Sequence, residues 1–259
     1  MDDGLAVEVS GLKKHFGAVE ALAGLDLRVP AGAFYAFLGP NGAGKSTTLS
    51  LLTGLLAPDA GEIRLFGESF SGAPIALKAR VGVVPETLAL FERLTGRQQL
   101  TFSGRLYGLS AQEAAGRAEE LLDVTELSGQ AEALVAGYSK GMRRRLAIAS
   151  ALIHAPRLVF LDEPFEGIDV LAAGVIRALL AELSRSGVTL VLTTHVLEIA
   201  DRLATHAGFI QAGRLLDEGS LGELRERHRS ADLQGVFERL ISVPAARSTQ
   251  LSFYPARGR

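Results

Sequence analysis

The sequence predicts an α/β protein with a mostly parallel sheet, an N-terminal antiparallel β subdomain and an inserted helical subdomain. Continuous apolar runs at 33–38, 158–162 and 188–194 are typical of strands buried in a parallel sheet. Two segments near the N-terminus alternate apolar and polar residues, which indicates half-exposed antiparallel strands. From about residue 87 to 150 the pattern becomes helical, so a helical insertion interrupts the α/β core.

The elements of the first third are expected in this order. Residues 5–10 and 25–29 form the alternating strands, and 33–38 the first buried strand. A glycine-rich loop and a helical pattern follow it. Residues 62–67 are expected to form an edge strand, and 80–84 a short buried strand.

Helices dominate the remainder of the predicted order. Residues 97–109 and 111–124 have amphipathic helical patterns, separated by turn signals. Residues 171–187 are a crossover helix between the two later buried strands. Residues 221–243 read as a charged and then amphipathic helical tail, and 247–259 as a polar, loosely ordered end.

Composition excludes several classes of protein. The 259 residues carry a formal net charge of −2, which gives no whole-molecule attraction to nucleic acid or acidic membranes. The absence of cysteine excludes disulfides and cysteine-bound zinc or iron–sulfur clusters. The N-terminus has no signal-peptide pattern, and no apolar run is long enough to span a bilayer. We therefore expect a soluble, cytoplasmic protein.

Residues 39–46, GPNGAGKS, fit the phosphate-binding pattern G-x-x-x-x-G-K-[ST], between a strand and a helix as that pattern requires. Glycines let backbone N–H groups turn around phosphate oxygens, at the positive end of the helix. Lys45 would reach the β- and γ-phosphates, Ser46 would ligate Mg²⁺, and Thr47 would add a hydroxyl near the α-phosphate. The segment predicts a P-loop NTPase core whose nucleotide-binding residues are Gly39, Asn41, Gly42, Gly44, Lys45, Ser46 and Thr47.

Asp162 and Glu163 end the buried strand at 158–162, and Pro164 stops it. In an open α/β sheet, ligands bind at this carboxyl edge. Asp162 can hold Mg²⁺ through water, and Glu163 can polarise the attacking water. Alone, the two acids could be an ordinary solvated strand end; the phosphate loop upstream favours a catalytic pair for hydrolysis.

With these motifs in place, residues from about 5 to 240 resemble the ATP-binding subunit of ABC transporters. Phe16 lies where that family stacks an aromatic ring on adenine, although it could be a plain core residue. YSKGM at 138–142 stands at the family's signature sequence. EGID at 166–169 matches a loop whose aspartate, here Asp169, acts across the dimer. His195 stands at the switch histidine that contacts the γ-phosphate, its alternative being a structural histidine.

Two departures from the family pattern narrow the resemblance. Glu86 occupies a position that is usually glutamine, and its carboxylate could still ligate Mg²⁺. In the signature, Ser139 and Gly141 keep the family residues, while Tyr138, Lys140 and Met142 replace Leu, Gly and Gln. Both variants, and VFERL at 236–240, are similar to the single-domain ATPases of type-2 exporters.

The resemblance implies an ATPase that works as a dimer with ATP and Mg²⁺. Two subunits, expected to be identical, would bind two ATP molecules head to tail, each site completed by the partner's Ser139, Gly141 and Asp169. Glu163, His195 and Lys45 would be catalytic, and Ser46, Glu86 and Asp162 would hold the metal. A separate membrane permease would dock near 86–110 and hold the protein on the cytoplasmic face; no nucleic-acid partner is expected.

This interpretation divides the chain into an ABC-type ATPase domain at 1–220, with its helical subdomain at about 87–150, and a C-terminal extension at 221–259. The alternative is a soluble ABC-type ATPase acting on nucleic acid, ribosomes or assembly machinery, which would share every nucleotide motif. A small-molecule kinase or GTPase would leave the signature and His195 unexplained.

The basic run in YSKGMRRRLAIAS, residues 138–150, could be read as a nucleic-acid patch. However, Met142, Leu146, Ala149 and Ile153 form one apolar helical stripe behind a helix start near Ser139. We therefore expect a helix cap followed by a solvated face, with Arg143 and Arg144 exposed to solvent, acidic neighbours or a partner subunit.

Overall fold

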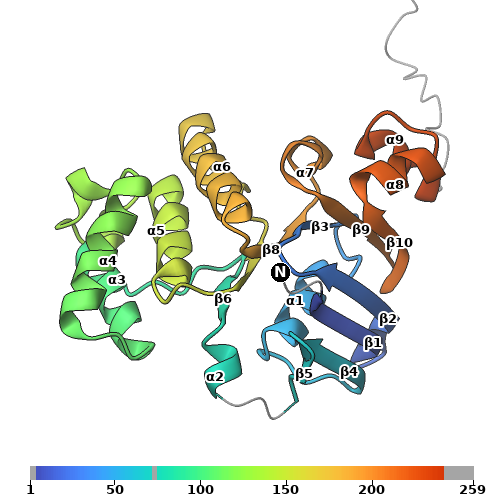
Figure 1. Cartoon of the computed structure of the whole chain (residues 1–259), viewed down its shortest axis with the longest axis horizontal. Helices are drawn as coiled ribbons and strands as arrows, with labels where there is room; N and C mark the ends of the chain where they lie inside the picture. Colours follow the sequence, from blue (N-terminus) through green and yellow to red (C-terminus); the bar gives the residue numbers. More distant parts are fainter. Residues whose placement is uncertain (1–3, 72–74, 242–259) are drawn as a thin grey trace, which may run out of the picture.

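The computed structural model describes residues 4–71 and 75–241 and contains two sheets (Figure 1). A six-stranded sheet has the order β10-β9-β3-β8-β7-β6, and a four-stranded sheet has the order β2-β1-β4-β5. The strands are β1 Leu5–Phe16, β2 Val19–Pro30, β3 Phe34–Leu38, β4 Ala60–Leu65, β5 Glu68–Ser69, β6 Val81–Val84, β7 Leu158–Asp162, β8 Thr189–Thr194, β9 His206–Gln211 and β10 Arg214–Ser220.

The six-stranded sheet confirms the predicted mostly parallel core. Every residue of β3, β7 and β8 is buried, as their continuous apolar sequences require. Leu38 pairs with Thr194, and Asp162 pairs with Thr193. This register brings the carboxyl ends of the three strands to one edge. On the other side of β3 lie β9, which is parallel to it, and β10, which is antiparallel to β9; neither was predicted.

The four-stranded sheet is the predicted antiparallel β subdomain. β1 pairs with β2 and with β4, and both pairings are antiparallel. The predicted edge position of 62–67 is wrong, because β4 lies between β1 and the two-residue β5. The edge is therefore formed by a strand too short to show periodicity in the sequence.

The helical insertion lies on the side of the molecule opposite this subdomain (Figure 1). Its helices α3, α4 and α5 surround a separate apolar cluster that includes Leu100, Leu122 and Leu146. α5 also contacts β6 and α6, so it is enclosed on more than one face. The helices are α1 Lys45–Leu52, α2 Ile75–Lys78, α3 Gly96–Leu106, α4 Ala111–Val124, α5 Lys140–Leu152, α6 Val170–Arg185, α7 Leu197–Leu203, α8 Leu221–Arg227 and α9 Leu233–Leu240, with 3₁₀ turns at Ser128–Gln130 and Val135–Gly137.

The predicted C-terminal helical tail consists of two short helices, α8 and α9. Leu224 of α8 and Val236 of α9 pack into the same core as Leu38 of β3 and Phe209 of β9. The C-terminal helices therefore cover the back of the strand that carries the phosphate loop. The predicted polar end at 247–259 lies outside the described residues.

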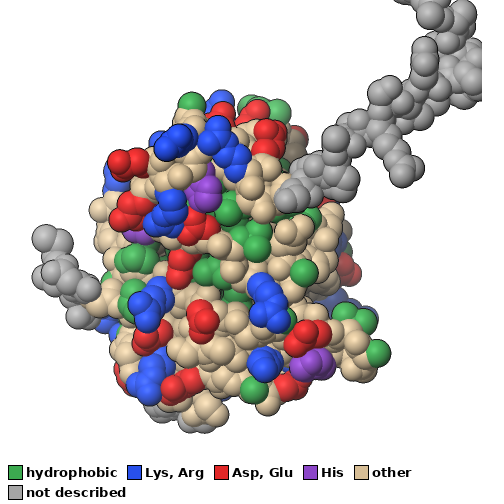
Figure 2. Space-filling view, turned by 90° about the vertical axis from the view of Figure 1, so that its right-hand side faces the viewer, with side chains coloured by type: hydrophobic (Ala, Val, Ile, Leu, Met, Phe, Trp, Pro, Cys, Tyr) green, Lys and Arg blue, Asp and Glu red, His purple; other side chains and the backbone are tan. Residues whose placement is uncertain are grey.

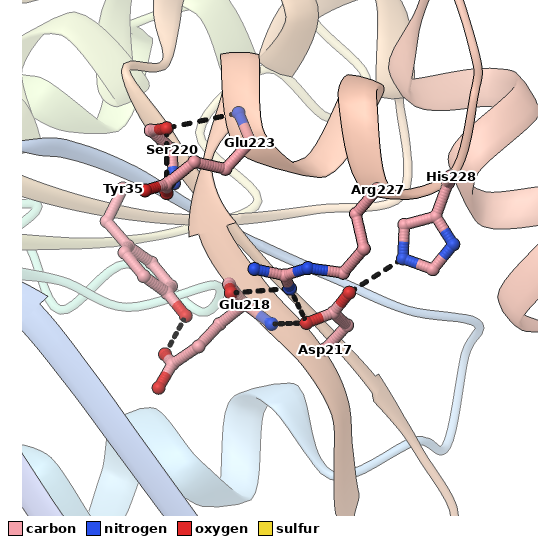
Figure 3. Close-up of polar contacts among 7 residues, drawn as sticks. All are labelled: Tyr35, Asp217, Glu218, Ser220, Glu223, Arg227 and His228. Carbon is pink, nitrogen blue, oxygen red and sulfur yellow. Dashed lines mark hydrogen bonds and ion pairs between the residues drawn. The ribbon is translucent and has the colours of Figure 1, made fainter.

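A polar cluster ties β3 and α8 to β10 (Figure 3). The hydroxyl of Tyr35 donates a 2.8 Å hydrogen bond to Glu218. Asp217 contacts both Arg227 and His228, the latter at 2.6 Å. Burial raises the pKa of Tyr35 well above its usual value, and the charge of Glu218 adds to that shift. Burial likewise raises the pKa of Glu218, against the hydrogen bond from Tyr35.

The surface on the β10 and α8–α9 side is mixed in charge. Figure 2 shows Lys and Arg side chains interspersed with Asp and Glu over this face. Within residues 4–71 and 75–241, no helix combines the length and hydropathy needed to cross a bilayer.

Candidate functional site

The phosphate loop connects β3 to α1 and is fitted closely against neighbouring backbone. A Cβ on Gly39 would lie 2.3 Å from the carbonyl oxygen of Ile210 in β9, which no side chain can tolerate. Gly44 has a φ of 110° and leaves 2.9 Å between an added Cβ and the carbonyl oxygen of Ala21. Both glycines are therefore required by the local packing, and α1 begins directly after them at Lys45.

Lys45 is buried and points back into the loop. Its Nζ donates hydrogen bonds to the carbonyl oxygens of Gly39 at 2.8 Å and Pro40 at 3.3 Å. The same atom lies 3.9 Å from Oε1 of Glu163. Burial lowers the pKa of Lys45, and the carboxylates of Glu163, Asp162 and Glu86 oppose that shift. These neighbours help keep a cation next to the loop.

Asp162 receives two hydroxyl groups at the carboxyl edge of the sheet. Ser46 Oγ donates to Asp162 Oδ1 at 3.3 Å, and the hydroxyl of Thr193 donates to the same oxygen. Ser46 and Asp162 thus bring a hydroxyl and a carboxylate oxygen together, and such hard oxygen donors suit Mg²⁺. Thr193 was not predicted, since a threonine within an apolar run reads as an ordinary β-branched strand residue.

Glu163 follows directly and adopts an unusual backbone conformation. Its φ is 44°, in the left-handed region that residues other than glycine seldom occupy. The backbone N–H of Glu163 is fixed by the carbonyl oxygen of Thr193 at 3.2 Å and its hydroxyl at 3.1 Å. Oε1 of Glu163 lies 3.1 Å from Nδ1 of His195, which is half exposed. Glu163 therefore lies between Lys45 and His195.

These groups meet at a cavity of about 440 Å³. Most of the predicted nucleotide-binding, catalytic and metal-binding residues line it, and Gly39 and Asp162 contact the residues that do. Lining residues that the sequence did not predict come from the start of β2, the 166–169 loop and the β9–β10 turn. The lining is Val19, Glu20, Ala21, Asn41, Gly42, Gly44, Lys45, Ser46, Thr47, Glu86, Glu163, Glu166, His195, Ala212 and Gly213.

Phe16 does not line this cavity. It ends β1, its ring is about half exposed, and the ammonium of Lys14 lies 5.8 Å from the ring centroid. Its strand partner Val19 does line the cavity. Stacking of adenine on Phe16 stays a prediction.

Ser139, Gly141 and Asp169 form a second group, apart from the cavity, which we call the helix-end group. The hydroxyl of Ser139 accepts from the backbone N–H of Met142 at 3.2 Å, so it caps α5 as predicted. Asp169 caps α6 by accepting from the N–H of Ala172 at 2.9 Å, and this bond lowers the pKa of Asp169.

Gly141 allows the two helix ends to touch. A Cβ at this position would lie 2.9 Å from Cβ of Ala172 and 3.2 Å from Oδ2 of Asp169. The helix-end group is therefore a compact unit in which the starts of α5 and α6 are packed together.

The arginines of the basic run are less exposed than predicted. Arg143 forms an ion pair with Glu92 at 2.9 Å, and Arg145 donates to the carbonyl oxygen of Thr125 at 2.7 Å. The predicted solvent exposure of Arg144 is wrong, because only 3% of this residue is accessible. α5 is covered by α3, β6 and α6, so a position off its main apolar stripe is still buried.

A mostly parallel sheet with a phosphate loop, an acidic strand end and a histidine at the same edge defines a nucleotide-hydrolysing P-loop protein. The model of the ABC transporter family matches residues 22–166, more than half of the chain. The chain belongs to this family and is an ABC-type ATPase.

Similarities to individual proteins agree with this family assignment. The chain is 41% identical to the daunorubicin/doxorubicin resistance ATP-binding protein DrrA of Streptomyces peucetius, over 92% of this chain and 75% of the relative. It is 39% identical to the Nod factor export ATP-binding protein I of Paraburkholderia xenovorans (strain LB400), over 90% and 76%. A dimeric ATP-binding cassette in a post-hydrolysis state, bound to ADP and Pi, superposes with a TM-score of 0.76 at 27% identity, covering 83% of this chain and 98% of that one.

Proposed function

We propose that this chain hydrolyses ATP as a dimer of identical subunits and thereby drives a separate membrane permease in export. The observation that carries the proposal is the meeting of the phosphate loop, Asp162, Glu163 and His195 at one cavity. The protein would then lie on the cytoplasmic face of the membrane, held there by its partner.

The cavity supplies the groups that hydrolysis needs. Backbone N–H groups of the loop, the start of α1 and the Lys45 ammonium bind the anionic phosphates. Glu163 accepts a proton from a water whose oxygen attacks the γ-phosphorus, while the bond from that phosphorus to the β,γ-bridging oxygen breaks and ADP leaves. His195, 3.1 Å from Glu163, orients the carboxylate and contacts the γ-phosphate.

Mg²⁺ fits the oxygen donors at the edge of the cavity. Ser46 and Asp162 would hold it, with Glu86 as a further carboxylate on the lining. When bound, the ion neutralises phosphate charge and polarises the phosphoryl group. The buried Thr193 hydroxyl keeps the Asp162 carboxylate oriented for this task.

A second subunit would complete each site. The helix-end group does not line the cavity of its own chain, yet it offers two helix N-termini, which favour anions. In a head-to-tail pair this group would cover the γ-phosphate bound by the other subunit. The similarity to a dimeric cassette that holds ADP and Pi supports this arrangement.

The docking surface proposed for the permease lies beside Glu86. A groove of about 230 Å³ runs between the 83–91 segment, α3 and α5. Phe91, Phe102 and Tyr107 are each 40% exposed or more, and the first two pack edge to face with ring centroids 5.3 Å apart. Exposed aromatic residues at a groove are suited to bind an apolar helix. The relative named for Nod factor export supports the direction of transport.

Glu163→Gln tests the proposal. The variant keeps the size of the side chain and one acceptor oxygen but cannot accept the proton, so turnover should fall at least about 100-fold while ATP still binds. Phosphate release and ATP binding are measured in parallel, and size-exclusion chromatography with MgATP should show a trapped dimer. Wild-type rates in the variant would refute the assignment of Glu163 as base, and a monomer that binds ATP would count against the shared sites.

A further inference from the structure

Arg144, the middle arginine of the basic run, is buried and bonded to Pro85, the residue before Glu86, which lines the ATP cavity. It lies on α5, and its Nη1 donates a 3.3 Å hydrogen bond to the carbonyl oxygen of Pro85, 59 residues away in sequence. Its Nε has no hydrogen-bond partner among the residues that the structure describes. A buried arginine with so few partners is costly, so a compensating interaction is expected.

The charges that act on Arg144 are carboxylates in and next to the cavity. Among the described residues that line it, four are acidic, Glu20, Glu86, Glu163 and Glu166, whereas Lys45 is the basic residue of constant charge. Such a lining would repel a triphosphate. Arg144 sits in the field of Glu166, Glu86, Asp162 and Glu163, which oppose the lowering of its pKa by burial. The guanidinium stays charged and is a second cation in the field of these carboxylates.

The two flanking arginines do not share this environment. Arg143 is paired with Glu92, and Arg145 with carbonyl oxygens at Thr125 and Glu126, all within the helical insertion. Arg144 instead joins the helical insertion to the segment that carries Glu86.

We propose that Arg144 is a positioning residue for ATP: its charge balances the carboxylates around the cavity, and its bond to Pro85 fixes Glu86 relative to the helix that begins at Ser139. This rests on the proposed function of the cavity as the ATP site. A charged glutamate at position 86 makes such a counter-charge necessary, because it adds a carboxylate to an already acidic lining.

The test is a double-substitution cycle on the full-length protein, measuring KM for MgATP and kcat. Arg144→Gln removes the charge and keeps a hydrogen-bond donor for Pro85. KM should rise about tenfold with a smaller change in kcat, because unbalanced carboxylates repel the bound phosphates. Arg144→Lys keeps the charge and should stay within about threefold of wild type. In Glu86→Gln/Arg144→Gln the loss of one carboxylate should recover at least about threefold of the KM change.

Arg143→Gln is the matched control, since it removes one charge from the adjacent position of the same helix and should leave KM within about twofold. Unchanged KM in Arg144→Gln, or effects that simply add in the double variant, would overturn the proposal. If Arg144→Gln does not fold, the Lys variant and the double variant decide: equal loss in both refutes the charge role. Absence of turnover in the wild-type protein would instead refute the proposed function.

Discussion

The cavity and the helix-end group carry most of the predicted functional residues, but they differ in how complete they are within one chain. In the cavity, Glu163 already contacts both Lys45 and His195, and Ser46 contacts Asp162. In the helix-end group, the side chains of Ser139 and Asp169 cap their own helices. The first region is a group of side chains that already contact one another, and the second is a pair of capped helix N-termini.

We infer from this difference that the cavity of one subunit binds ATP, whereas hydrolysis at full rate also depends on a second subunit. In the proposed mechanism, one subunit holds the phosphates and Mg²⁺ with its own residues. Catalysis at full rate would need the helix ends of a second copy, since its own lie outside the cavity. Substitutions in the two regions should therefore have separable effects.

Lys45→Ala should impair ATP binding at the cavity and have the largest effect of these substitutions. It removes the buried ammonium and its charge-assisted hydrogen bonds, so ATP affinity should fall about 100-fold. Equilibrium binding of a fluorescent ATP analogue measures this. Lys78→Ala, at an exposed lysine of α2, is the matched control and should bind like the wild type; equal affinity in both variants would contradict the role of the loop.

Ser139→Ala should impair the helix-end group. ATP affinity of the monomer should stay within about twofold, whereas ATP-dependent dimerisation and turnover should fall about tenfold, because the partner's γ-phosphate loses its cover. Light scattering measures dimerisation, and phosphate release measures turnover.

Ser110→Ala is the control for the loss of a cap. Ser110 accepts from the N–H of Glu113 at the start of α4, so the variant should lose about 1 kcal/mol of stability, as Ser139→Ala does, yet keep its turnover. A similar drop in turnover in both variants would reduce Ser139 to a structural cap.

Tyr35→Phe should lower stability without affecting either the cavity or the helix-end group. It leaves the half-buried carboxylate of Glu218 without its 2.8 Å donor, which should cost about 1–3 kcal/mol in urea unfolding. The hydroxyl favours the charged carboxylate, so the cost should be full above the raised pKa of Glu218 and shrink as pH falls through it. Turnover should change by less than about twofold; a larger change would mean that β10 acts on the site.

The site could be predicted from sequence where function depends on strand ends. The loop after β3, Asp162 at the end of β7 and His195 after β8 each follow a continuous apolar run, and the carboxyl ends of parallel strands meet at one edge. The glycines were predictable because backbone approach to phosphate leaves no room for side chains. Their equally close fit to β9 and to Ala21 was not, because it depends on long-range packing.

Other features depended on contacts that no local pattern reveals. The stripe of α5 predicted one buried face, but α3, α4, α6 and β6 all pack against this helix, and Arg144 is buried as well. β10 is partly exposed along its length and shows no clear alternation, and β9 is fixed by its pairing with β3. The division at residue 220 stays a prediction, although α8 and α9 share a core with β3 and β9.

The backbone of Glu163 has a consequence for how this protein can be altered. Its positive φ costs on the order of 1–2 kcal/mol for a side chain, and glycine would relieve it. With Glu163 as the proposed base, folding and chemistry make opposite demands on this position. Selection for thermal stability alone would tend to replace the carboxylate and yield a sturdier protein that binds ATP without consuming it.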